Sequence, residues 1–309
     1  MRRWDGLVDA YLEEYVARGV CTAGADNVRR ELERWGNWMK RRRPRPKLEE
    51  VGPQLLIRYI EQRTPFRAKA TVYSVMSRMR GMGDFLVREQ LWPSNPLRWL
   101  QGPKLAPYQR LPKRIDADAM QLMWEAAAKR SGRYQQHASI TLLALLYGTG
   151  LRRGELHRLD VSDWSREDGA LRIDGRKTGR ERLVPVPELV YRCMEAYLPL
   201  RHNRLAQRGR LDESALFLGS DGRRLSEAGV SYVVHRLARR AGVQLHSLHQ
   251  FRHTCASELI AAGVRLPEVQ RILGHSGIGT TMRYLHVADP ERRAAIAQHP
   301  INAWLEEAA

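Results

Sequence analysis

Cysteine and long apolar runs are both scarce in this sequence of 309 residues. Its three cysteines, Cys21, Cys193 and Cys255, lack the paired spacing of a disulfide framework or a zinc site, which indicates a reducing, cytoplasmic setting. The most apolar stretch, residues 140–147, is much too short to cross a bilayer. The first fifteen residues contain charges without a following apolar segment, so we expect neither a secretory signal nor a membrane partner.

Acidic side chains are also in deficit. The sequence has 52 Lys and Arg against 34 Asp and Glu, a formal net charge of +18. Such an excess favours a polyanionic partner, usually nucleic acid, although the arginine-rich composition of a GC-rich genome is an alternative explanation. No cluster of carboxylates accompanies the histidines near the C-terminal end, and their basic neighbours would repel a divalent cation. A metal-dependent nuclease is therefore disfavoured, and no metal site is expected.

Residues 1–100 have apolar side chains at helical spacing. One stripe runs through residues 7–15, a second through 28–39, a third through 55–60 and the longest through 72–86, before Pro93 and Pro96 end the pattern. We therefore predict a helical domain over residues 1–100. Residues 101–114 (QGPKLAPYQRLPKR) contain three prolines and several basic residues with little periodicity, which is typical of an interdomain linker.

Residues 115–309 combine helical stretches with one strand-like segment. Asp116 is expected to cap a helix, and a second apolar helix over residues 140–147 is expected to end at Gly148–Gly150. Residues 170–187 alternate on both sides of a basic, Gly-containing turn, with Leu183, Val184 and Val186 as the second apolar run, which predicts a β-hairpin. Later helices are expected to stop near Gly242, Gly263 and Gly274, with a helical tail from about residue 290. The predicted fold is mainly α with a small β-sheet or hairpin, an α+β domain following the helical one.

Two basic side chains of the second domain are suited to contact a phosphodiester. Arg152, in TGLRRGEL, is predicted in the first turn of a helix, where its guanidinium adds donors to free backbone N–H groups. Lys177, at the tip of the predicted hairpin, could reach a DNA backbone and give up a proton. Taken alone, each is more typical of a solvated surface residue.

Three further clusters follow toward the C-terminal end. His249 and Arg252, in HQFRH, lie three residues apart and can share a helix face, while Phe251 anchors in the core. His275 follows a predicted helix end, and Tyr284 comes nine residues later in MRYLHV. A lone tyrosine beside Leu285 and Val287 is by itself more typical of a packed core.

The order and spacing of these clusters resemble the tyrosine recombinase (phage integrase) family, of the Xer-like, two-domain kind without an arm-binding domain. The matching stretches are TGLRRGEL, GRKTGRERLVP, HQFRH, LGHSGIGTT and MRYLHV, and they extend over the whole second domain. The first domain is similar to the family's core-binding domain in helix number and position only. This chain departs from the family pattern in having Phe251 where leucine is more usual, and in having Arg153 directly after Arg152.

The resemblance implies a DNA strand transferase that needs neither a metal nor ATP. Tyr284 would attack the scissile phosphate and form a 3′-phosphotyrosyl link, which retains the bond energy for rejoining. Arg152 and Arg252 would clamp the non-bridging oxygens.

The remaining roles concern protons and positioning. Lys177 would protonate the leaving 5′-oxygen, His249 would exchange a proton near the tyrosine, and His275 would help to position the phosphate. Glu155 and Asp160 are predicted to be structural or to orient basic neighbours.

The resemblance also implies the partners. These are double-stranded DNA with paired core sites, and a homo-tetramer, or a hetero-tetramer with a related recombinase, in the bacterial nucleoid. The chain's last helical stretch, which contains Trp304, would pack on a neighbouring protomer or, alternatively, on its own domain. The basic residues predicted to contact DNA phosphates are Arg41, Arg42, Arg43, Lys47, Arg67, Lys69, Arg78, Lys104 and Arg110.

Two alternatives share parts of this pattern. A type IB topoisomerase would use similar chemistry without pairing two sites. A catalytically idle DNA-binding protein would lack some of the motif residues, all of which are present here.

Overall fold

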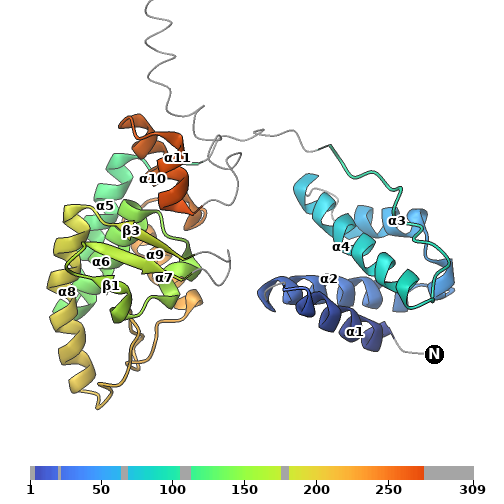
Figure 1. Ribbon diagram of the computed structural model, residues 1–309, viewed down its shortest axis with the longest axis horizontal. Coiled ribbons are helices and arrows are strands. Elements are labelled where there is room, and N and C mark those ends of the chain that lie inside the picture. Colours follow the sequence, from blue (N-terminus) through green and yellow to red (C-terminus); the bar gives the residue numbers. More distant parts are fainter. Residues whose placement is uncertain (1–3, 20–21, 64–68, 105–112, 175–180, 275–309) are drawn as a thin grey trace, which may run out of the picture. The chain divides into compact units, whose positions relative to one another are not determined.

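The computed structural model describes residues 4–19, 22–63, 69–104, 113–174 and 181–274 (Figure 1). The chain divides into two compact units, Met1–Pro107 and Tyr108–Ala309, and the division falls within the predicted linker. Among the helices in these ranges, none combines the length and apolar character that a bilayer span requires.

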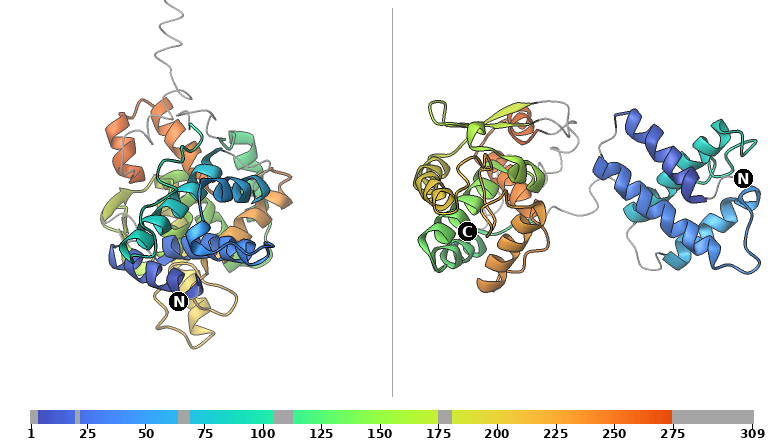
Figure 2. Two further views of the ribbon diagram at one scale, coloured as in Figure 1. Left: turned by 90° about the vertical axis from the view of Figure 1, so that its right-hand side faces the viewer. Right: turned by 90° about the horizontal axis from the view of Figure 1, so that it is seen from below.

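The first unit is helical. It contains α1 (Trp4–Ala17), α2 (Thr22–Lys40), a short 3-10 helix η1 (Leu48–Glu50), α3 (Pro53–Arg63) and α4 (Lys69–Arg88). Each long helix turns one apolar face inward, and α4 crosses α1 and α2 (Figure 2). The predicted stripes form this core: Leu32 and Leu56, for example, have no exposed surface. Burial of these faces, which periodicity had indicated, holds the short helices together.

The second unit is built around one buried helix. Its helices are α5 (Ala117–Ala128), α6 (Arg133–Thr149), α7 (Arg153–Arg158), η2 (Val161–Asp163), α8 (Glu188–Ala206), α9 (Glu227–Arg240), α10 (His249–Ala261) and α11 (Leu266–Leu273). Residues 142–146 of α6 are all buried, and α5, α8 and α10 pack around this helix (Figure 1). The predicted cap of α5 is confirmed, since the Asp116 carboxylate accepts a 2.7 Å hydrogen bond from the Ala119 backbone N–H.

The β-hairpin is confirmed, as part of a three-stranded antiparallel sheet in the order β1-β2-β3. Its strands are β1 (Trp164–Ser165), which the sequence did not predict, β2 (Ala170–Ile173) and β3 (Arg182–Pro185). Within the apolar run of β3, Leu183 is 64% exposed, while Val184 is buried. Because neighbouring strand residues face opposite sides, Arg182 shares the inward side with Val184.

Glycines end several helices where the sequence predicted. Gly150 and Gly274 are the C-caps of α6 and α11, both in the left-handed region with φ of 61° and 64°. A side chain is strained in that region, so glycine suits both positions. Gly242 and Gly263 also have positive φ, just beyond α9 and α10. These two tight turns at Gly150 and Gly274 bring backbone carbonyls to the site described next.

Candidate functional site

Arg152 is the N-cap of α7, one residue before the first turn in which it was predicted. Its Nη1 donates to Glu155 Oε1 at 2.7 Å and its Nη2 donates to the Gly274 carbonyl at 3.0 Å. The Glu155 carboxylate also accepts the Arg152 backbone N–H at 2.8 Å. The guanidinium is thus oriented on two sides while 31% of the side chain stays exposed.

Arg153 points elsewhere. Its Nε donates to Glu227 at 2.9 Å and its Nη1 donates to Ser231 at 3.1 Å, both on α9. The two adjacent arginines therefore contact different elements: Arg153 contacts α9, and Arg152 contacts the end of α11.

Glu155 is buried between two arginines. Its side chain is 6% exposed, and Arg182 binds it with both terminal nitrogens, Nη1 to Oε1 at 3.1 Å and Nη2 to Oε2 at 3.0 Å. Burial alone would raise the pKa of Glu155, but the hydrogen bonds and charges of Arg182 and Arg152 outweigh it and hold the pKa at about 2. The prediction that Glu155 orients basic neighbours is confirmed.

Arg252 and His249 lie in the first turn of α10 but differ in exposure. Arg252 is 1% exposed and donates from Nη1 to the Gly150 carbonyl at 3.0 Å and from Nη2 to the Leu273 carbonyl at 2.5 Å. His249 is exposed, and its ring lies edge-on to that of His253, with centroids 4.5 Å apart. Phe251 is fully buried, as predicted.

Three arginines donate hydrogen bonds to three consecutive backbone carbonyls at the C-terminal end of α11. Arg182 Nε donates to Ile272 at 3.1 Å, Arg252 to Leu273 and Arg152 to Gly274. Carbonyls of a last helical turn have no partners within the helix and carry the negative end of its dipole, so they attract cations. Among the described residues, three guanidinium groups meet one carboxylate here, and this surplus of positive charge suits an anionic ligand such as a phosphate.

Arg182 was missed in the sequence. It lies only five residues after Lys177, and its neighbours Glu181 and Leu183 are exposed. If Val184 is taken as buried, the alternation of a strand places Arg182 on the same inward side. Nothing else in the sequence distinguishes Arg182 from the other basic residues of the turn.

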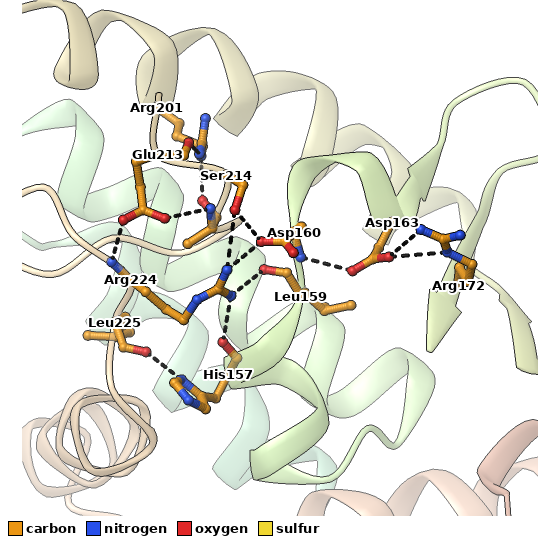
Figure 3. Close-up of polar contacts among 11 residues, drawn as sticks. His157, Leu159, Asp160, Asp163, Arg172, Arg201, Glu213, Ser214, Arg224 and Leu225 are labelled. Carbon is orange, nitrogen blue, oxygen red and sulfur yellow. Dashed lines mark hydrogen bonds and ion pairs between the residues drawn. The ribbon is translucent and has the colours of Figure 1, made fainter. Parts of the chain in front are cut away.

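The other end of α7 is fastened by Arg224 (Figure 3). Arg224 Nη1 donates to the carbonyls of His157 and Leu159 at 3.1 Å each, and Nη2 pairs with Asp160. Ser214 also donates to Asp160, at 2.8 Å. The prediction for Asp160 is therefore confirmed as well: it orients an arginine, and this contact fixes the helix whose other end carries Arg152.

Several predicted site residues lie outside the described residues, namely Lys177, His275 and Tyr284, together with Arg67, Arg110 and the terminal stretch containing Trp304. Within the described ranges, no three His, Cys, Asp or Glu side chains are grouped so that they could hold a metal ion.

Seven of the basic residues predicted to contact DNA lie in described parts of the first unit. Exposed among them are Arg41, Arg43, Lys47, Lys69 and Lys104, whereas Arg42 and Arg78 are half-buried. The Arg42 guanidinium lies over the Trp38 ring, 4.1 Å from its centroid, and Arg43 donates to nearby backbone carbonyls. Their contacts with DNA remain a prediction.

The depressed pKa of Glu155 makes the second unit sensitive to acid. Because this carboxyl titrates at about 2 when folded and near 4.5 when unfolded, its ionised form contributes about 3 kcal/mol to stability above about pH 5. That contribution is lost as the pH falls from about 4.5 toward 2. We expect the unfolding free energies of the wild type and Glu155→Gln, measured in urea, to converge by about 2 kcal/mol between pH 6 and pH 3.

A matched control for this measurement is Glu188→Gln, which removes an exposed carboxylate paired with Arg192. Its difference from the wild type should stay small at both pH values, because exposed pairs contribute little. An equal difference for Glu155→Gln at pH 6 and pH 3 would contradict the assignment.

The profile of the phage integrase family matches residues 113–291. The tyrosine recombinase XerC of Stutzerimonas stutzeri is 32% identical over 296 residues, which cover 94% of this chain and 94% of that protein.

Two solved structures share the fold at low sequence identity. A XerH site-specific recombinase bound to palindromic difH substrate, in a post-cleavage complex, is 19% identical with a TM-score of 0.73, covering 91% of this chain and 81% of that one. A lambda integrase tetramer bound to a Holliday junction is 19% identical with a TM-score of 0.64, covering 88% and 77%.

Proposed function

This chain belongs to the phage integrase family, and we propose that it is a site-specific recombinase that cleaves and rejoins DNA through a 3′-phosphotyrosyl intermediate. The observation that carries the proposal is the meeting of two motif arginines at one helix end. Arg152 and Arg252 come from motifs 100 residues apart, yet they bind the adjacent carbonyls of Gly274 and Leu273, directly before His275.

The proposed reaction is an in-line displacement at phosphorus. The Tyr284 hydroxyl oxygen forms a bond to phosphorus while the bond to the 5′-oxygen breaks, and no metal or nucleotide takes part. Arg152 stabilises the negative charge on the non-bridging oxygens. Arg252 contributes to the same stabilisation once the DNA reaches its guanidinium. Rejoining reverses the displacement with a 5′-hydroxyl as nucleophile.

Proton transfers complete the balance of this reaction. The tyrosine proton passes to His249, and the leaving 5′-oxygen takes a proton from Lys177. His275 donates a hydrogen bond that helps to position the phosphate.

The proposed partners are a DNA duplex with paired core sites and other recombinase protomers. The lambda integrase neighbour was solved as a tetramer on a Holliday junction, which supports a homo-tetramer or a mixed tetramer here. The first unit's basic residues would contribute phosphate contacts, so affinity should fall steeply with salt. Movement of a mobile element and resolution of chromosomal DNA in the nucleoid are both compatible with this activity.

Covalent trapping tests the proposal. The protein is incubated with a pool of nicked duplexes whose cores are randomised, so that cleavage releases a short strand and prevents rejoining. We expect a detergent-stable protein–DNA adduct, and mass spectrometry of its peptides should locate the nucleotide on Tyr284. Absence of any adduct from the pool, or attachment to another residue, would contradict the proposal.

A second measurement separates recombination from relaxation. Sites recovered from the trapped DNA are cloned as pairs in a supercoiled plasmid. A recombinase should exchange the flanking segments, whereas a topoisomerase should change only the supercoiling. The family membership favours exchange.

A further inference from the structure

Arg182 occupies an unusual position for an arginine in a strand. It opens β3, its side chain is only 12% exposed, and it pairs across the sheet with buried Ile173. Its three guanidinium nitrogens all donate hydrogen bonds, two to Glu155 on α7 and one to Ile272 at the end of α11. One side chain therefore joins three elements: the strand, the helix that carries Arg152, and the helix that leads to His275.

The backbone at the end of α11 is shaped around this guanidinium. A Cβ atom on Gly274 would lie 2.7 Å from Arg182 Nη1 and 2.8 Å from its Cζ, so only glycine allows the contact as it stands. The Gly274 carbonyl in turn accepts the hydrogen bond from Arg152. Arg182 thus touches both anchors of Arg152, the Glu155 carboxylate and the Gly274 backbone.

We propose that Arg182 is a positioning residue for strand cleavage, holding Glu155 and the end of α11 in the places where they orient Arg152. This rests on the proposed recombinase function of the site. Without Arg182, Glu155 keeps its contact with Arg152 but loses the two hydrogen bonds from Arg182, and the Ile272 carbonyl loses the one from Arg182 Nε. Both anchors of Arg152 are then held less firmly in place. Misplacement of a phosphate clamp by about 1 Å can slow a reaction by about 100-fold.

The role requires a guanidinium rather than any cation. Glu155 and Ile272 lie in different directions, and the planar fork of arginine reaches both with fixed donors. A lysine at this position would supply the charge but a single donor atom. Arg182→Lys should therefore fold and still position Arg152 poorly.

The test compares Arg182→Met and Arg182→Lys with the control Arg172→Met. Arg172 belongs to the same hairpin but is 56% exposed and pairs with Asp163 at the surface. With the nicked-duplex pool, single-turnover adduct formation should slow by about 10- to 100-fold for both Arg182 variants. It should change by less than about twofold for Arg172→Met. Duplex affinity should stay close to wild type in all three.

Two readouts separate positioning from a general loss of structure. In a Glu155→Gln background, Arg182→Met should slow adduct formation by less than it does in the wild type, because the part of its effect that passes through Glu155 is already lost. In Arg182→Met alone, the pH below which the cleavage rate falls should be higher. Arg182 no longer holds the pKa of Glu155 at about 2, so this carboxylate takes up a proton at higher pH. A structural role would produce neither result.

A measurement without DNA keeps this proposal separate from the proposed function. In nitrogen-15 NMR spectra, the Arg152 guanidinium protons should exchange with solvent at least about fivefold faster in Arg182→Lys than in Arg172→Met. If the wild type forms no adduct, the recombinase function fails while this result still decides the role of Arg182. Unchanged exchange, or full cleavage activity in Arg182→Lys, would overturn the proposal.

Discussion

Replacing Tyr284 with phenylalanine is expected to abolish the covalent adduct, lowering the rate of strand cleavage by about 10⁴-fold or more. Phenylalanine lacks the hydroxyl oxygen that forms the bond to phosphorus in the proposed reaction, and the basic groups proposed to bind the phosphate cannot substitute for it. Duplex binding should be retained, because arginine and lysine contacts to the backbone supply most of the affinity. The nicked-duplex assay measures the adduct, and a gel-shift titration measures the affinity.

The matched control for this variant is Tyr232→Phe. Tyr232 lies on α9 with 65% of its surface exposed, away from the motif residues in sequence. Its loss of a hydroxyl should leave adduct formation unchanged. Persistence of the adduct in Tyr284→Phe would mean that another residue is the nucleophile.

Replacing Arg152 with alanine is expected to slow strand cleavage by about 100- to 1,000-fold at nearly unchanged duplex affinity. The guanidinium is held in advance by Glu155 and Gly274, so the proposed stabilisation of the transition state requires little reorganisation. Arg152→Lys should recover only a small part of the rate, because one ammonium cannot bind both anchors and a phosphate in fixed geometry. Single-turnover kinetics on the nicked pool give the rate constants.

Arg153→Ala is the natural control, since it removes the adjacent arginine. Arg153 is directed to Glu227 and Ser231 on α9, so its loss should change the cleavage rate by less than about threefold. A large effect of Arg153→Ala together with a small effect of Arg152→Ala would mean that the motif register is shifted by one residue.

Helices were the most predictable part of this fold. The apolar stripes that contain Leu12 and Leu86 face the core as their spacing indicated, because a helix of 3.6 residues per turn brings such positions to one face. Strand β1 escaped prediction because two residues show no alternation. Leu183 belongs to the apolar run of the predicted hairpin, and its exposure next to buried Val184 follows from the two-residue period of the strand.

The candidate site was predictable in its residue types and less so in its contacts. The motifs predicted Arg152 and Arg252 as phosphate ligands, and spacing placed His249 on the same helical turn as Arg252. The burial of Arg252 beneath the Gly150 and Leu273 carbonyls was not foreseen, and neither was the inward side chain of Arg182. Backbone carbonyls have the same chemistry at every position, so no sequence pattern reveals which of them will accept an arginine.

Sequence by itself determined the helical character, the hairpin, the excess of positive charge and the family of this protein, because periodicity, composition and motif order are local properties of the chain. Only the tertiary structure decided which groups meet. It brought Ile272, Leu273 and Gly274 to three arginines from β3, α10 and the start of α7. It also surrounded one buried carboxylate, Glu155, with two of those arginines. Such contacts span more than 100 residues in the case of Arg152 and Gly274, and the packing of α7, α10 and α11 creates them.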